Sequence, residues 1–207
     1  SLGWPFGPFV QLLMLTLQRR QDVAAMRWAE VSEDLTTWTI PGRRTKNGKE
    51  HVVHLAPEAR ALLRGLPRMA GADLVFTTTG RTPISGYSRA AARQKAAIER
   101  ERARLGGTAD GDPRPAPPLD WVWHDFRRTG VTRLAQLGFP PHVADKILNH
   151  QDGEISGVAA IYQRFEFLAE RAQALEAWAR HVLAVGDGSH HSAAAGKVIP
   201  LQARPRR

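Results

Sequence analysis

The sequence predicts an α+β fold that is mainly α-helical, with a small antiparallel β-sheet near the N-terminal third. Segments with apolar residues at helical spacing make up most of the chain. Two β-rich runs, 36–41 and 51–55, flank a basic segment that contains the turn-forming dipeptide Asn47-Gly48. The chain has 207 residues, of which 43% are apolar, so it has enough apolar material for one sizeable core.

The first part of the chain is expected to form the following elements in order: an apolar helix over 8–20, a helical stretch over 22–28, strands over 36–41 and 51–55, a short helix over 57–66, and a short strand over 73–78. Asp22 suits the first turn of the second helical stretch, and it could orient the local backbone or the guanidinium of Arg19. Pro57 favours a helix start because its missing N–H would have no partner there. The loop between the two main strands is expected to be longer than two residues.

Helices dominate the second half of the chain. Ser88 is a candidate N-cap for a helix over 89–104, which carries six basic and two acidic side chains. That charge fits either a solvated helix or a basic wall along a nucleic-acid backbone. Beyond this helix we expect a Gly/Pro-rich loop over 106–118 and helices over 124–137, 141–148, 156–164 and 167–185. The expected organisation is one domain over 1–185 and a flexible tail over 186–207.

Composition narrows the function classes. Lys and Arg total 29 against 20 acidic residues, and the resulting net charge of +9 favours polyanionic partners, nucleic acid first. No apolar run approaches the roughly 20 residues of a membrane helix, and the N-terminus does not resemble a signal peptide. The chain has no cysteine, which excludes disulfides and thiolate metal sites and fits a reducing compartment. We therefore expect a cytoplasmic protein with no membrane partner.

A small set of polar side chains could carry chemistry. A guanidinium can bind two phosphate oxygens at once, a buried lysine can deliver a proton, and a tyrosine near cations can act as a nucleophile. His124 and Arg127 stand three residues apart, which brings them onto one helical face. Taken singly, each residue is more often a surface cation, a helix cap or a core tyrosine. The candidates are Arg19, Lys46, His124, Arg127, His150 and Tyr162.

The order Arg…Lys…His-x-x-Arg…His…Tyr resembles the tyrosine recombinase, or phage integrase, family. The segments that carry the resemblance are "LTLQRRQDV", "TKNGKEHVVHL", "WHDFRRTGVTRLAQLG", "ADKILNH" and "GVAAIYQRF", which together span residues 15–165. Two positions depart from the common pattern, since Leu17 and Asn149 stand where many members carry glycine. Tyr162 also follows His150 by 12 positions, a few more than in the tightest members.

The resemblance implies an enzyme that cuts and rejoins DNA through a 3′-phosphotyrosine intermediate, without ATP, metal or another cofactor. By resemblance, Arg19 and Arg127 hold the phosphate and His150 donates to a non-bridging oxygen. Lys46 would protonate the leaving 5′-oxygen, and His124 would act near Tyr162 as an acid/base or a positioning donor. The implied partners are double-stranded attachment sites of a prophage or mobile element, bound by a homo-tetramer. Family members usually carry an N-terminal DNA-binding domain, so we expect this chain to be a catalytic-domain fragment.

Three other functions fit parts of the pattern. A catalytically inactive DNA-binding regulator would share the fold, and a type IB topoisomerase would share the chemistry but relax supercoils. In a third class, His124-Asp125 could be the metal-binding pair of a phosphohydrolase, with His142 and Asp145 as further ligands. The presence of all six expected polar residues favours the recombinase.

Overall fold

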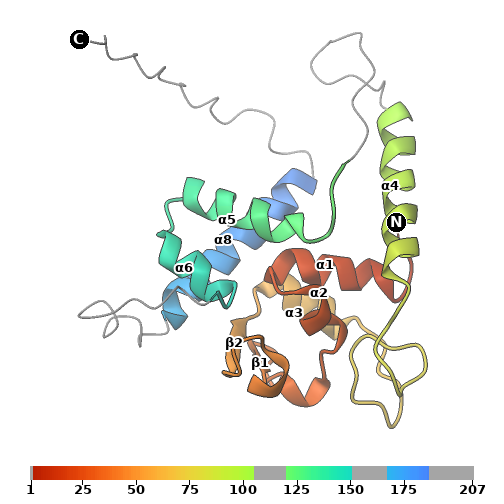
Figure 1. Ribbon diagram of the computed structural model, residues 1–207, viewed down its shortest axis with the longest axis horizontal. Coiled ribbons are helices and arrows are strands. Elements are labelled where there is room, and N and C mark those ends of the chain that lie inside the picture. Colours follow the sequence, from red (N-terminus) through yellow and green to blue (C-terminus); the bar gives the residue numbers. More distant parts are fainter. Residues whose placement is uncertain (1, 105–119, 151–166, 187–207) are drawn as a thin grey trace.

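The computed structural model describes residues 2–104, 120–150 and 167–186 (Figure 1). Their elements are α1 (Phe6–Thr16), α2 (Arg20–Ala24), η1 (Trp28–Glu30), β1 (Thr37–Ile40), η2 (Gly42–Arg44), β2 (His51–His54), α3 (Pro57–Arg64), α4 (Tyr87–Arg104), α5 (Asp125–Gln136), α6 (Pro141–Ile147) and α8 (Leu168–Gly186). The predicted fold class, mainly helical with a small antiparallel sheet, is confirmed.

Helix α1 is the centre of the fold. Figure 1 shows α5, α6 and α8 gathered on one side of it, and α2, α3 and the β1–β2 sheet on the other. Its apolar side chains Phe9 and Leu12 are fully buried. Phe9 lies 5.5 Å from the ring of Phe76 and 5.7 Å from that of Trp123, so the N-terminal helix and the segment before α5 share one aromatic core.

The hairpin forms where the β-rich runs predict it. β1 and β2 pair antiparallel from Thr37 opposite His54 to Ile40 opposite His51. Alternate residues are buried on both strands, which is the pattern of a sheet with one face on the core. The connection runs over 41–50 and includes the 3₁₀ turn η2, so the longer loop is confirmed.

Several predicted boundaries differ from the structure. The strand predicted over 73–78 does not form, because only Leu74 pairs, in an isolated bridge with Arg27, and a turn held by Thr77 follows at once. Helix α1 ends at Thr16 because Leu17 adopts a left-handed backbone, with φ of 56°. Ser88 lies inside the first turn of α4, so it is not the N-cap.

Helix α8 packs within its own chain. Leu175 and Trp178 are buried against the core, and the indole N–H of Trp178 donates to the carbonyl of Met14 at 2.7 Å. Among the described residues no helix is both long and apolar enough to cross a membrane. The loop predicted over 106–118, the helix over 156–164 and nearly all of the tail lie outside the described residues.

Candidate active site

The C-terminal end of α6 is where donors from distant parts of the chain meet. Three successive backbone carbonyls there accept hydrogen bonds from side chains of other elements. The carbonyl of Ile147 accepts from Gln18 Nε2 at 2.9 Å and from His51 Nε2 at 3.2 Å. The carbonyl of Leu148 accepts from Arg127 Nη2 at 2.8 Å, and that of Asn149 accepts from Arg19 Nη2 at 3.3 Å. The last carbonyls of a helix have no partner within the helix. Side chains from α5, β2 and the segment after α1 therefore complete this helix end.

Arg127 is a buried cation held by backbone carbonyls. Its side chain comes from the first turn of α5 and is only 4% exposed. Besides the bond to Leu148, its Nη1 donates to the carbonyl of Leu17. Burial, and next the charge of Arg19, lower the pKa of Arg127 to about 10, while Asp22 opposes the shift. The guanidinium remains charged at neutral pH and has a fixed orientation.

Two left-handed residues shape this site. Leu17 has φ of 56° and Asn149 has φ of 49°, a conformation that favours glycine and, after it, asparagine. Both positions are ones that the sequence analysis noted as departures from the glycine common in the family that the chain resembles. The turn at Leu17 directs its carbonyl to Arg127, and the turn at Asn149 directs its carbonyl to Arg19.

Asp22 supplies negative charge close to the arginines of the site. Burial raises the pKa of Asp22, while Arg19, Arg44 and Arg127 act to lower it. Arg44, at the end of η2, donates to the carbonyl of Asp22 at 3.2 Å and pairs with Glu30 at 3.0 Å. The carboxylate therefore offsets some of the repulsion between neighbouring guanidiniums.

A cavity of about 670 Å³ opens beside this helix end. Its lining includes three of the predicted site residues, Arg19, His124 and Arg127, which the structure brings together from the junction of α1 and α2 and from the start of α5. Arg20 adds a further cation, whose guanidinium lies 4.7 Å from the ring centre of Tyr87. Such a concentration of cations suits a polyanion.

Lys46 and His150 lie near this centre but do not line the cavity. Lys46 is exposed in the loop between β1 and β2. Its neighbour Asn47 donates from Nδ2 to Oδ1 of Asn149 at 2.7 Å, which brings the loop to the end of α6. His150 follows Asn149 directly, and its Nδ1 lies 3.5 Å from Oδ1 of Asp145. Tyr162 lies outside the described residues.

Sequence analysis missed the residues that support the arginines. Gln18, His51 and Asn47 all bond to the end of α6. Gln18 stands next to a candidate arginine, and Asn47 next to a candidate lysine, so adjacency was an available signal. His51 has no such signal. Successive residues of a strand point to opposite faces of the sheet, and this pattern does not say which partner a buried histidine has.

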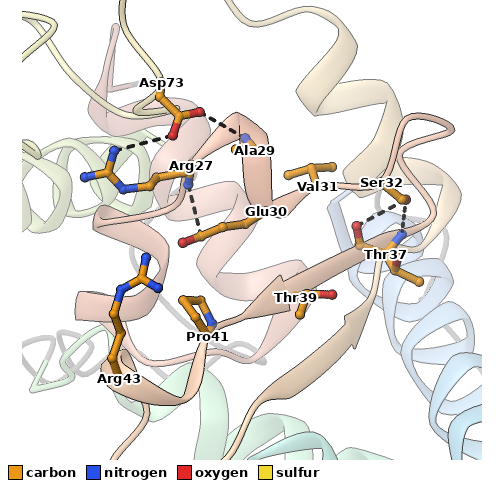
Figure 2. Close-up of a pocket in the computed structure, with 10 residues that line it drawn as sticks. All are labelled: Arg27, Ala29, Glu30, Val31, Ser32, Thr37, Thr39, Pro41, Arg43 and Asp73. Carbon is orange, nitrogen blue, oxygen red and sulfur yellow. Dashed lines mark hydrogen bonds and ion pairs between the residues drawn. The ribbon is translucent and has the colours of Figure 1, made fainter.

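A second pocket lies beside η1 and β1 and contains none of the predicted site residues (Figure 2). Its lining residues are Arg27, Ala29, Glu30, Val31, Ser32, Thr37, Thr39, Pro41, Arg43 and Asp73. Figure 2 shows the guanidinium of Arg27 beside Asp73, at 3.4 Å. Because carboxylates neutralise cations here, this pocket is less suited to a phosphate than the cavity beside α6.

The structure does not support the phosphohydrolase hypothesis. Over 2–104, 120–150 and 167–186, no three histidine or carboxylate side chains gather as they would around a metal ion. The carboxylate of Asp125 instead accepts from the backbone N–H of Val122 at 2.9 Å and from Arg128 at 3.4 Å.

Comparison with known proteins agrees with the resemblance in the sequence. The profile of the phage integrase family matches residues 7–166. This chain belongs to the phage integrase family. Within the family it is similar to Prophage integrase IntA of Escherichia coli (strain K12), with 30% identity over 179 residues, covering 85% of this chain. The chain spans 38% of the length of that relative. No solved structure matches the chain significantly.

Proposed function

We propose that residues 1–185 of this phage integrase family member form the catalytic domain of a site-specific DNA recombinase. In this proposal the domain cleaves and rejoins DNA through a 3′-phosphotyrosine intermediate and serves a prophage or mobile element. The observation that carries the proposal is the convergence of Arg19 and Arg127 on one helix end, beside a cavity that His124 also lines. The name of the IntA relative, a prophage integrase, supports the biological context.

The two guanidiniums would hold the scissile phosphate. Besides its nucleophile, the reaction needs fixed positive charge at the phosphate oxygens that gain charge in the transition state. Arg127 has a fixed orientation because carbonyls hold it, and Arg19 is tied to the adjacent carbonyl of Asn149. His150 follows Asn149 directly, and in the proposal it donates to a non-bridging oxygen.

Tyr162 is the proposed nucleophile, and the other tyrosine of the chain is unsuited to that role. The chain has two tyrosines. The hydroxyl of Tyr87 donates to the carbonyl of Ile84 at 2.6 Å, and burial raises the pKa of Tyr87 although Arg20 opposes the shift. A phenol with a raised pKa forms the attacking phenolate less readily.

The proposed step balances without an external reagent. The phenolate oxygen of Tyr162 bonds to phosphorus as the bond from phosphorus to the 5′-oxygen breaks. Lys46 gives a proton to the departing 5′-oxygen. The phenolic proton of Tyr162 passes to His124 where that residue acts as the acid/base, and to water where His124 only positions the tyrosine. A 5′-hydroxyl from the partner strand reverses the step, so the bond energy is kept in the phosphotyrosine and neither ATP nor a metal is needed.

The proposed partners are double-stranded attachment sites, bound by a homo-tetramer in the cytoplasm. The net charge of +9 supports a DNA partner. The inactive regulator and the type IB topoisomerase remain alternatives that activity measurements can separate. A regulator would bind the same site without forming a covalent adduct, and a topoisomerase would relax plasmids that lack the site.

A nicked suicide duplex carrying the attachment site tests the nucleophile. Cleavage next to the nick releases a short fragment, so the covalent complex accumulates and can be resolved by denaturing electrophoresis. The unmodified chain is expected to form this adduct, and Tyr162→Phe is expected to form none because it lacks the attacking oxygen. Tyr87→Phe is the matched control and is expected to retain the adduct. An adduct with Tyr162→Phe would refute the assignment, and adduct loss in Tyr87→Phe alone would move the nucleophile to Tyr87.

A further inference from the structure

We propose that the hydrogen bond between Asn47 and Asn149 positions Lys46 for proton transfer to the leaving 5′-oxygen. The inference rests on the proposed function, because it concerns the step in which that oxygen departs. It assigns Asn47 and Asn149 as positioning residues, a role that acts through Lys46 and not by contact with DNA.

The bond joins two parts of the chain that are 102 positions apart. Nδ2 of Asn47 donates to Oδ1 of Asn149 at 2.7 Å, a short bond for an amide pair. The other end of the Asn47 amide is also used, since its Oδ1 accepts from the backbone N–H of Lys49 at 3.2 Å. The side chain is thus held by its own loop on one side and by the end of α6 on the other.

Asn149 is itself held firmly. Its carbonyl accepts from Arg19, and its N–H donates to the carbonyl of Lys146 at 3.2 Å. The same residue therefore contacts a phosphate-binding arginine through its backbone and the lysine loop through its side chain. His150 is the next residue. The proposed catalytic groups Arg19, Lys46 and His150 are therefore all connected to Asn149.

The backbone conformation of Asn149 supports a specific role for its side chain. Asn149 has φ of 49°, where glycine is the least strained choice. Asparagine tolerates this region better than most residues, but it keeps a side chain that the turn does not require. The bond to Asn47 gives that side chain a role, which glycine at this position would not supply.

Lys46 needs such a restraint. Its side chain is exposed, and it lies in the loop that connects β1 and β2. Contacts within the loop, from Thr45 Oγ1 to the carbonyls of Gly42 and Lys49, shape the turn but do not place it against α6. A general acid must lie within hydrogen-bond reach of the proton acceptor, and a small displacement lowers the rate steeply.

Replacing the leaving oxygen by sulfur tests this role directly. In a 5′-bridging phosphorothiolate duplex, the departing group is a thiolate, which leaves without a proton from an acid. Asn149→Gly removes the bond and suits the left-handed backbone, so the variant is expected to fold. Its single-turnover cleavage of the ordinary duplex is expected to fall roughly tenfold, within the range of acid catalysis. On the sulfur duplex, its rate is expected to return to within about twofold of the unmodified chain.

Two further variants complete the experiment. Lys46→Ala is expected to lose roughly a hundredfold or more on the ordinary duplex and to be rescued by sulfur. Asn47→Ala removes the bond from the other side, together with the contact to the N–H of Lys49, and is expected to be at least as slow as Asn149→Gly. The double variant of Asn47 and Asn149 is expected to be no slower than Asn47→Ala alone, because the bond that Asn149→Gly removes is already absent there.

The outcomes separate the inference from the proposed function. If sulfur does not rescue Lys46→Ala, the leaving-group role of Lys46 fails, and the positioning role fails with it. If sulfur rescues Lys46→Ala but Asn149→Gly cleaves the ordinary duplex at the unmodified rate, only the positioning role fails. An Asn149→Gly rate that is reduced equally on both duplexes would show a general structural defect and would also overturn the inference.

Discussion

Leu17 combines a strained backbone with a fully buried side chain. Its left-handed conformation costs about 1–2 kcal/mol for a residue with a Cβ, yet its side chain is completely inaccessible. Both methyl groups pack against Gly130 of α5, where a Cβ on Gly130 would lie 2.6 Å from Cδ1 and from Cδ2 of Leu17. The absence of a side chain at Gly130 therefore allows the leucine, and the leucine carbonyl binds Arg127.

Gly130→Ala tests this packing. In an ordinary helix, glycine to alanine stabilises by up to about 1 kcal/mol, but here the new methyl meets a side chain that has no room to move. We expect a loss of about 1–3 kcal/mol in the free energy of unfolding, measured by urea denaturation. In a Leu17→Ala background the same change is expected to be neutral or stabilising. An equal loss in both backgrounds would contradict the contact with Leu17.

At the scale of elements, the end of α6 joins helices and sheet into one unit. His51 of β2 is buried and bonds to the carbonyl of Ile147. Because a carbonyl only accepts hydrogen bonds, Nε2 of the imidazole carries a proton. A neutral ring carries one such proton, so its Nδ1 is then unprotonated. Burial, followed by the charge of Arg171, lowers the pKa of His51 to about 3, with smaller contributions from Arg127 and Arg19 in the same direction.

This buried histidine predicts a pH dependence of stability. An unfolded histidine titrates near 6.5, whereas His51 stays neutral down to about 3 in the folded protein. Below a pH of about 6.5 the unfolded chain therefore binds a proton that the folded chain does not, and stability falls as the pH falls. His51 accounts for about 2 kcal/mol of the loss expected between pH 7 and pH 5.

His51→Leu is the variant that isolates this contribution. Gln18 still donates to the carbonyl of Ile147, so the substitution leaves no unpaired acceptor there. Urea denaturation at pH 7 and pH 5 is expected to show a smaller loss of stability in His51→Leu than in the unmodified chain. Equal losses in the two proteins would mean that His51 is protonated in the folded state.

For the molecule as a whole, charge is the dominant property. The chain has a net charge of +9, and α4 contributes to its basic surface through Arg89, Arg93 and Arg100, which are exposed. Arg102 and Arg104 pair within the helix, with Glu99 and Glu101. Lys95 lies over the ring of Trp121. Exposed arginines fit both expectations for this helix, a solvated surface and a wall along the DNA backbone.

The salt dependence of DNA binding distinguishes a solvated α4 from an α4 that follows the DNA backbone. Each phosphate contact releases counterions, so the affinity for a duplex is expected to fall by at least about tenfold between 50 mM and 200 mM salt. If α4 follows the backbone, Arg93→Gln is expected to lower the slope of log affinity against log salt by about one. Fluorescence anisotropy of a labelled duplex measures both. Tight binding that is insensitive to salt would contradict the electrostatic basis, and an unchanged slope would indicate a solvated α4.

The elements that could be predicted from the sequence are those whose interactions are local along the chain. The hairpin was predictable because its signals, alternating apolar residues and Asn47-Gly48, are local. The strand over 73–78 was predicted wrongly because its pairing partner is a short segment around Arg27, which local composition does not reveal. The end of α1 was misplaced because the left-handed turn occurs at Leu17, a residue type that gives no sign of it.

Most of the elements, the basic charge and the motifs that place this chain in the phage integrase family can be recognised in the sequence alone. These depend on neighbours along the chain and on residue types. The meeting of Arg19 and Arg127 at the end of α6, where Gln18 and His51 bind the carbonyl of Ile147, is a result of tertiary packing. Their partners lie up to 130 positions away, so the packing of several elements brings them together, and no local pattern encodes that packing.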